Sequence, residues 1–165
     1  KNAFISYAFN EVFGVTMEEA IAKVDEFVEG NYFFDLKPID DAVKVLDLIY
    51  KKNHSMYIIT SRSTKREKIT KEQLEKHFGD KFISIDFSKN HYTGWGEKTK
   101  AEICTDLGID YHVEDSLEYA REIVKETPKT KVLLFDAPWN QTQEKLNSRI
   151  KRVMSLEQIF DSLGG

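Results

Sequence analysis

The sequence has little cysteine, little proline and no long apolar run. Its 165 residues include one cysteine, Cys104, and three prolines. A single cysteine excludes an internal disulfide and a metal site built from cysteines. No apolar run approaches the roughly 20 residues that span a bilayer, and no secretory signal is visible. We therefore expect a cytoplasmic protein without a membrane partner.

Charge of neither sign predominates. Lysine and arginine number 24 against 28 aspartates and glutamates, which gives a formal net charge of −4. Because the two signs are interspersed, no basic face is expected that would bind a nucleic-acid polymer. Hydrophobic residues make up 41% of the chain, which at this length is typical of one globular domain, residues 1–165.

The first 31 residues carry only helical patterns. Apolar residues recur at helical spacing within 2–14, and Gly14 suits the end of that helix. A capping box at 16–19 begins a second helix that continues to about Val28. We expect residues 1–31 to form a small helical cap on a core made of residues 32–165.

From Pro38 onward, helical and strand patterns alternate. Pro38 is placed to begin a helix, with Asp40 and Asp41 in its first turn. The apolar run 56–60 is typical of a strand buried on both faces, and a capping box at 64–67 predicts the next helix. Further strands are expected at 82–86, 111–114, 132–135 and 152–154. Parallel strands need such helical crossovers, so the pattern predicts an α/β fold, a Rossmann-like three-layer sandwich around a parallel sheet.

Two adjacent acids, Glu114 and Asp115, follow the expected strand 111–114. Ligands of open α/β sheets bind at the carboxyl ends of strands. Two carboxylates there repel each other unless a cation intervenes, and a hard divalent ion such as Mg²⁺ is suited to that role. Alternatively, the acids only favour the positive end of the helix that begins at Ser116.

Candidate phosphate ligands follow other strands. Thr60, Ser61 and Arg62 end the apolar run, where hydroxyls and backbone N–H groups suit an anion; their alternative role is to precede a helix cap. Lys98 and Lys100 stand at a helix start, where a lysine opposes the helix dipole and a phosphate would explain it. Both are otherwise ordinary surface lysines.

A hydroxyl, then a lysine and then an acidic pair follow one another along the chain, and this order resembles the order of the motifs in the haloacid dehalogenase-like phosphohydrolases. Thr60 is similar to their second motif, Lys98 or Lys100 to their third, with Lys100 preferred, and Glu114 with Asp115 to their acidic fourth motif. Phrases at 58–62, 132–136 and 138–140 resemble the 5′-nucleotidase and deoxyribonucleotidase branch. The resemblance implies Mg²⁺ bound by Glu114 and Asp115, with Thr60, Lys100 and Asp115 as catalytic residues.

The resemblance also implies an aspartate nucleophile in an Asp-x-Asp motif at the end of a central first strand. No Asp-x-Asp occurs in this sequence, and Asp86 ends a strand in the wrong topological position. Loss of a central strand leaves buried backbone groups unpaired, at about 1–3 kcal/mol each. We expect either that such a strand precedes Lys1 in the natural protein, or that a partner chain, such as a second copy, supplies it.

The expected function is hydrolysis of a small phosphomonoester, with a nucleotide as the favoured substrate. Aromatic residues near the expected site would stack on a base; they are Tyr32, Phe33, Phe34, His91, Tyr92 and Trp95. The alternative is a catalytically inactive binding or assembly subunit with the same fold. A dinucleotide-binding protein is disfavoured, because neither a Gly-x-Gly-x-x-Gly motif after a strand nor a P-loop is present.

Overall fold

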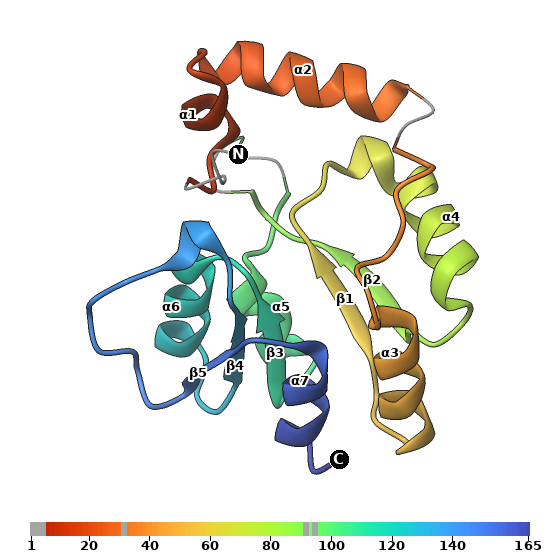
Figure 1. Ribbon diagram of the computed structural model, residues 1–165, viewed down its shortest axis with the longest axis vertical. Helices are drawn as coiled ribbons and strands as arrows, with labels where there is room; N and C mark the ends of the chain where they lie inside the picture. Colours follow the sequence, from red (N-terminus) through yellow and green to blue (C-terminus); the bar gives the residue numbers. More distant parts are fainter. Residues whose placement is uncertain (1–5, 31–32, 91–92, 94–95) are drawn as a thin grey trace.

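A computed structural model of the chain describes residues 6–30, 33–90, 93 and 96–165. After two N-terminal helices, helices and strands alternate to the C-terminus, as the sequence predicted (Figure 1). The α helices are α1 (Phe9–Phe13), α2 (Met17–Glu29), α3 (Ala42–Lys51), α4 (Glu67–Phe78), α5 (Lys100–Asp106), α6 (Leu117–Glu126) and α7 (Leu156–Ser162). The strands are β1 (Tyr57–Thr60), β2 (Ser84–Phe87), β3 (Tyr111–Glu114), β4 (Lys131–Phe135) and β5 (Ile150–Val153), and two 3₁₀ helices are η1 (Thr64–Arg66) and η2 (Pro138–Asn140).

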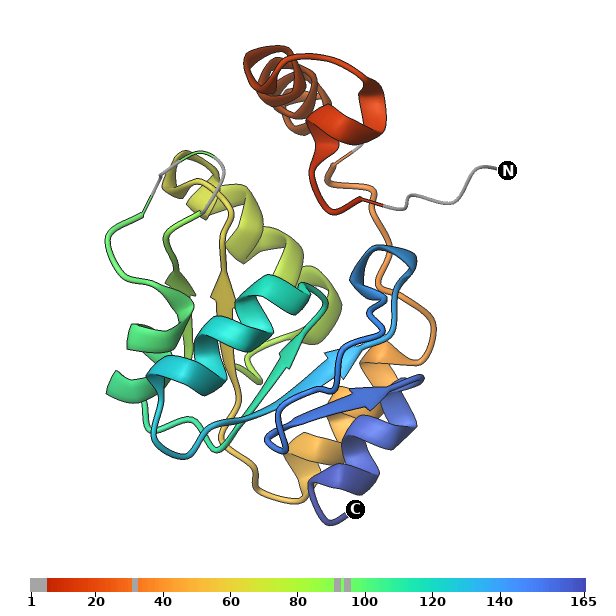
Figure 2. The same cartoon turned by 90° about the vertical axis from the view of Figure 1, so that its left-hand side faces the viewer.

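Strand β4 shows why the core has three layers. Val132 and Leu134 are fully buried in a cluster with residues of α5 and α6. Leu133, between them, is buried on the opposite face against α3 and α7. Successive side chains of a strand alternate between its two faces, so a strand apolar at every position requires helices on both sides. Figure 2 shows these two helical layers on either side of the strands.

The strands form two parallel sheets. One has the order β1-β2 and the other the order β3-β4-β5. Among the described residues, no backbone hydrogen bond joins β1 to β3. Val113, in the middle of β3, is 47% exposed, and all four residues of β1 are only partly buried. The sheet is therefore broken between β1, which ends at Thr60, and β3, which ends at Glu114.

Helices α1 and α2 lie beyond the carboxyl ends of the strands (Figure 1). The capping box predicted at 16–19 is present: the Thr16 hydroxyl accepts the Glu19 N–H, and the Glu19 carboxylate accepts the Thr16 N–H. Gly14 ends α1 with φ +64°, a left-handed conformation that glycine adopts without strain. The first helix covers Phe9–Phe13 of the expected range 2–14, and residues 2–5 of that range lie outside the described part.

Two predicted helix starts are wrong. Helix α3 begins at Ala42 instead of Pro38, because Asp41 has φ +63° and a right-handed helix cannot continue through that conformation. The box predicted at 64–67 is a 3₁₀ turn, in which buried Ser63 accepts the Lys65 N–H. Glu67 pairs with Lys71 along α4 instead of capping. No helix of the described residues combines the length and apolar character needed to cross a membrane.

Candidate functional site

The end of β1 forms a turn closed by its own hydroxyls. The Thr60 hydroxyl accepts the Arg62 backbone N–H at 3.3 Å. The Ser61 hydroxyl lies 3.0 Å from the Ser88 hydroxyl, beyond β2, and 3.4 Å from the Tyr119 hydroxyl on α6. Ser61 therefore links the end of β1 both to the segment after β2 and to helix α6.

The Arg62 guanidinium, predicted to bind phosphate, is held by protein groups. It lies 4.7 Å from the centre of the Phe33 ring and donates to the Gln73 side chain at 3.1 Å. Gln73 in turn donates to the Phe33 carbonyl at 3.0 Å. Burial lowers the pKa of Arg62. These contacts fasten the segment after α2 onto α4.

Lys100 and Glu114 form a buried ion pair. The Lys100 ammonium lies 2.6 Å from the Glu114 carboxylate, and the two side chains are 8% and 3% exposed. The ammonium also lies 4.4 Å from the centre of the Tyr119 ring. Lys98 is different: its side chain is 62% exposed and pairs with Asp106. Of the two candidate lysines, the structure brings only Lys100 to the acidic pair.

Both carboxylate oxygens of Glu114 are occupied by protein donors. One accepts the backbone N–H groups of Asp115 and Ser116, at 3.0 and 3.1 Å. The other accepts Lys100 and lies 3.4 Å from His112. Burial opposes ionisation, but the hydrogen bond from His112 and the charge of Lys100 outweigh it and hold the pKa of Glu114 well below its usual range. Glu114 thus holds the turn that precedes helix α6 and neutralises Lys100, whereas Ser116 caps the helix itself.

Asp115 is the acid that faces open space. Its backbone carbonyl accepts the Trp139 indole N–H at 3.0 Å and the Asn140 amide at 2.9 Å, which fixes the strand end. Burial and the neighbouring charge of Glu114 raise the pKa of Asp115 to about 6, against the smaller opposing effect of Lys100. A carboxylate with a raised pKa beside a second carboxylate gains from a bound cation.

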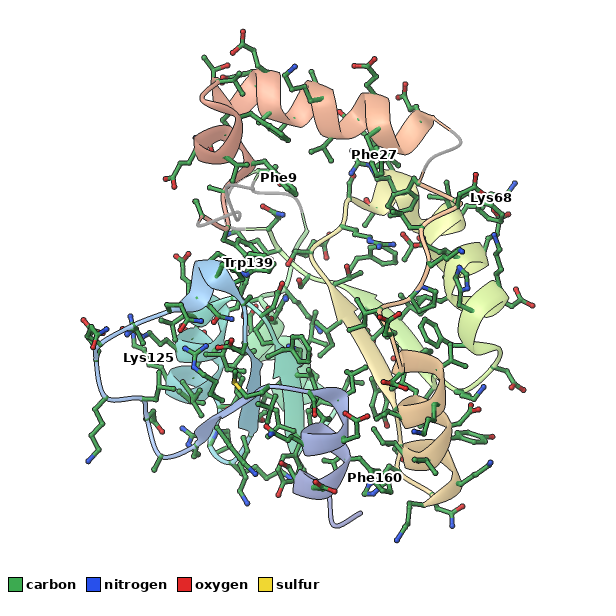
Figure 3. All side chains as sticks on the ribbon, viewed as in Figure 1. Phe9, Phe27, Lys68, Lys125, Trp139 and Phe160 are labelled. Atoms are coloured by element: carbon green, nitrogen blue, oxygen red, sulfur yellow. The ribbon has the colours of Figure 1, made fainter. Side chains whose placement is uncertain are left out.

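A cavity of about 500 Å³ lies between the helical cap and these strand ends. Ser61, Arg62 and Asp115 line it on the core side, together with Trp139. Figure 3 shows Trp139 below α1, on the side of the core that faces Phe9. The cavity therefore brings the ends of β1 and β3 into one site, on opposite sides of the gap between the sheets. Thr60 adjoins the cavity through Ser61, and its own hydroxyl is bonded within the turn.

The described residues fit a Mg²⁺ ion held by a single carboxylate. They contain no group of three or more metal-ligating side chains, and Glu114 already has a full set of partners. Mg²⁺ is often bound through one or two carboxylates, with water and substrate phosphate completing its coordination. Asp115 is the residue that would hold the ion.

Sequence reasoning missed the residues that support the site. Tyr119 contacts Ser61 and Lys100, and it is fully buried. Asn140, 1% exposed, donates to the carbonyls of Asp115 and Phe135 and accepts from Arg152. Asn140 lies in the segment 138–140 that was singled out from the sequence, but its bonding partners come from three separate segments. Several aromatic residues that were expected to stack on a nucleotide base lie outside the described residues, namely Tyr32, His91, Tyr92 and Trp95. Phe33, another of them, is buried against the Arg62 guanidinium.

Comparisons of the sequence with protein-family models and with curated proteins found no match. Among solved structures, the fold matches a crystal structure from Lactobacillus delbrueckii subsp. bulgaricus, described as a "putative phosphoglycolate phosphatase", with a TM-score of 0.57 at 13% sequence identity. The match covers 92% of this chain and 65% of that one, so the chain spans less than two thirds of that structure's length. The chain thus has the Rossmann-like α/β fold of this phosphatase-type structure.

Proposed function

We propose that this chain forms the phosphate- and cation-binding part of a Mg²⁺-dependent phosphomonoester hydrolase of the haloacid dehalogenase type. The observation that carries the proposal is that Ser61 and Asp115, at the ends of β1 and β3, line one cavity. The buried Lys100–Glu114 pair lies next to Asp115 and contacts Tyr119, whose hydroxyl lies near Ser61. Hydroxyl, cation and carboxylate are the groups that phosphoryl transfer needs around the phosphate and its metal ion.

Each residue has a distinct task in this proposal. Backbone N–H groups and the hydroxyls of Thr60 and Ser61 receive the phosphate oxygens at the end of β1. Lys100 supplies positive charge beneath Asp115, where Glu114 and the Tyr119 ring fix its ammonium. Asp115 holds Mg²⁺, which when bound supplies charge neutralisation for the phosphate. Glu114, with both oxygens occupied, positions Lys100 and the start of α6.

The finer proposal concerns the substrate. The phrases at 58–62 and 138–140 favour the 5′-nucleotidase and deoxyribonucleotidase branch, and therefore a nucleotide. The structural neighbour is described as a phosphatase for phosphoglycolate, which is the competing small substrate. Cleavage of a nucleoside monophosphate in preference to phosphoglycolate would support a nucleotide substrate. The reverse preference would support phosphoglycolate.

A second function is favoured by the broken sheet. The sequence has no Asp-x-Asp motif, and β1 and β3 are not hydrogen-bonded to each other in the described structure. A subunit of this kind would bind phosphate or metal without forming a phosphoaspartate, and an added strand from a partner would complete its sheet.

Turnover of p-nitrophenyl phosphate by the natural full-length protein, with and without Mg²⁺, separates the two functions. The hydrolase hypothesis expects Mg²⁺-dependent turnover that Asp115→Asn abolishes. Asp110→Asn is the matched control, because Asp110 lies before β3 and its side chain is 74% exposed in a surface pair with Lys129. Phosphate binding without turnover supports the inactive subunit, whereas neither binding nor turnover refutes both.

A further inference from the structure

The inner face of helix α2 is apolar and lines the cavity. Met17, Ala20, Ile21 and Val24 follow helical spacing, and all four contribute to the cavity wall. The charged residues of the same helix lie on the exposed side, at Glu18, Glu19, Lys23 and Glu26. Of the four apolar side chains, only Ala20 is fully buried by the protein itself. The cap thus presents an apolar surface to the cavity that faces the phosphate-binding strand ends.

The cations that line this cavity are already neutralised or bonded. Arg66 forms an ion pair with Asp25 of α2. Arg62 donates to Gln73 and stacks on Phe33. The third charged lining residue is Asp115, which would hold Mg²⁺ in the proposed function. Among the described lining residues, Arg66 is therefore neutralised by an acid, whereas Arg62 keeps its positive charge among uncharged partners.

Aromatic rings border the same space. The Trp139 indole lines the cavity, and its N–H bond to the Asp115 carbonyl holds the ring in place. Tyr7 lines it opposite, with its ring edge-on to Tyr119 at 6.4 Å. A fixed indole and an aliphatic helix face together suit a flat, uncharged ring. The volume of about 500 Å³ is within the range of small-molecule sites.

We propose that the organic part of the ligand is an uncharged aromatic group, which packs beneath the apolar face of α2 while the phosphate lies at the strand ends. This inference rests on the proposed function, because the strand ends must receive the phosphate. It divides the ligand between two surfaces: the core recognises the phosphate, and Met17, Ile21 and Val24 recognise the ring.

Three phosphonates that resist hydrolysis test this division by isothermal titration calorimetry on the full chain with Mg²⁺. They share one head group and carry a naphthylmethyl, a methyl or a carboxymethyl substituent. Covering about 100 Å² of apolar surface predicts that the naphthylmethyl compound binds on the order of 50-fold more tightly than the methyl compound. The carboxymethyl compound, which has no apolar ring, should not show this gain over the methyl compound.

Two variants of α2 locate the effect. Ile21→Asp places a carboxylate on the cavity face and should remove most of the preference for the naphthylmethyl compound, with little change for the methyl compound. Ala22→Asp adds the same charge on the exposed side of the helix and should change neither affinity. Ile21→Leu should retain the preference, which separates loss of an apolar contact from disturbance of the helix.

The outcomes distinguish this inference from the proposed function. If the methyl compound binds in an Mg²⁺- and Asp115-dependent manner but the naphthyl group adds nothing, the function stands and the inference is overturned. An equal loss of preference in Ile21→Asp and Ala22→Asp also overturns it. Failure of all three phosphonates to bind would refute the proposed phosphate site, and with it both the proposed function and this inference.

Discussion

Replacement of Lys100 by methionine should destabilise the protein by about 3 kcal/mol at neutral pH. Methionine keeps the length and apolar stem of lysine but removes the ammonium that lies 2.6 Å from the Glu114 carboxylate. Breaking a buried ion pair by removing one partner costs about 3–5 kcal/mol, because a buried charge remains uncompensated. Two backbone N–H groups and His112 still support Glu114, which places the expected loss at the lower end of that range.

A double-mutant cycle isolates this pair. Glu114→Gln keeps an acceptor for the backbone N–H groups and removes the negative charge. The double variant Lys100→Met with Glu114→Gln leaves neither charge buried, so it should be about 2 kcal/mol more stable than the sum of the single effects predicts. Urea unfolding followed by far-ultraviolet circular dichroism gives the free energy of unfolding for all four proteins.

The pH dependence gives a second test of the same pair. In the unsubstituted protein the pKa of Glu114 is held low, so its stabilising contribution is present at neutral pH and disappears only in strong acid. In Lys100→Met the isolated, buried carboxyl should protonate more readily than in the unfolded chain. The difference in stability between the two proteins should therefore shrink as the pH falls. Additive single effects, or a pH-independent difference, would refute the reasoning.

Three further predictions address the surrounding site. Asp115→Asn should raise the free energy of unfolding by about 1 kcal/mol at pH 7 but not near pH 4. An acid whose pKa rises to about 6 on folding destabilises the protein only once the pH exceeds the pKa of that acid in the unfolded chain. An equal effect at both pH values in urea titrations would contradict this. Asn140→Ala should lower the free energy of unfolding by about 3 kcal/mol, because it leaves the partly buried Phe135 carbonyl without its side-chain donor. Asn147→Ala, at the surface, should lower it by under about 1 kcal/mol in the same urea titrations. Gly96→Ala should lower the melting temperature more than Gly108→Ala. Both glycines have positive φ, but only at Gly96 would a Cβ meet the backbone, 2.5 Å from the Ser88 carbonyl oxygen. Equal losses of melting temperature would argue against this contact.

Local pattern was sufficient for the order of elements and for several helix starts. The capping box predicted at Thr16 is present, because it depends on contacts within four residues. The parallel α/β class follows from the alternation itself. The start predicted at Pro38 failed for a local reason that composition does not encode, the left-handed backbone of Asp41.

The separate roles of Glu114 and Asp115 could not be read from the sequence. Adjacent residues at a strand end direct their side chains to different surroundings, and here one meets Lys100 while the other faces the cavity. Likewise, Lys98 and Lys100 have similar sequence contexts, yet one is exposed and the other is buried. These differences depend on tertiary contacts, as do the bonds that Asn140 makes to Asp115 and Arg152.

The break between β1 and β3 has a consequence for the motions of the chain. Among the described residues, no backbone hydrogen-bond ladder joins the two sheets; α3 packs with α7 on one face, and α5 contacts β1 on the other. Side-chain packing tolerates sliding that a hydrogen-bonded ladder resists, so the β1-β2 unit should open on its own. Native-state hydrogen exchange should then find two tiers of protection, with amides of β1 and β2 exchanging at a lower free energy than those of β4. The two walls of the cavity would move with these units, so that widening of the site and local opening of the sheet become a single motion.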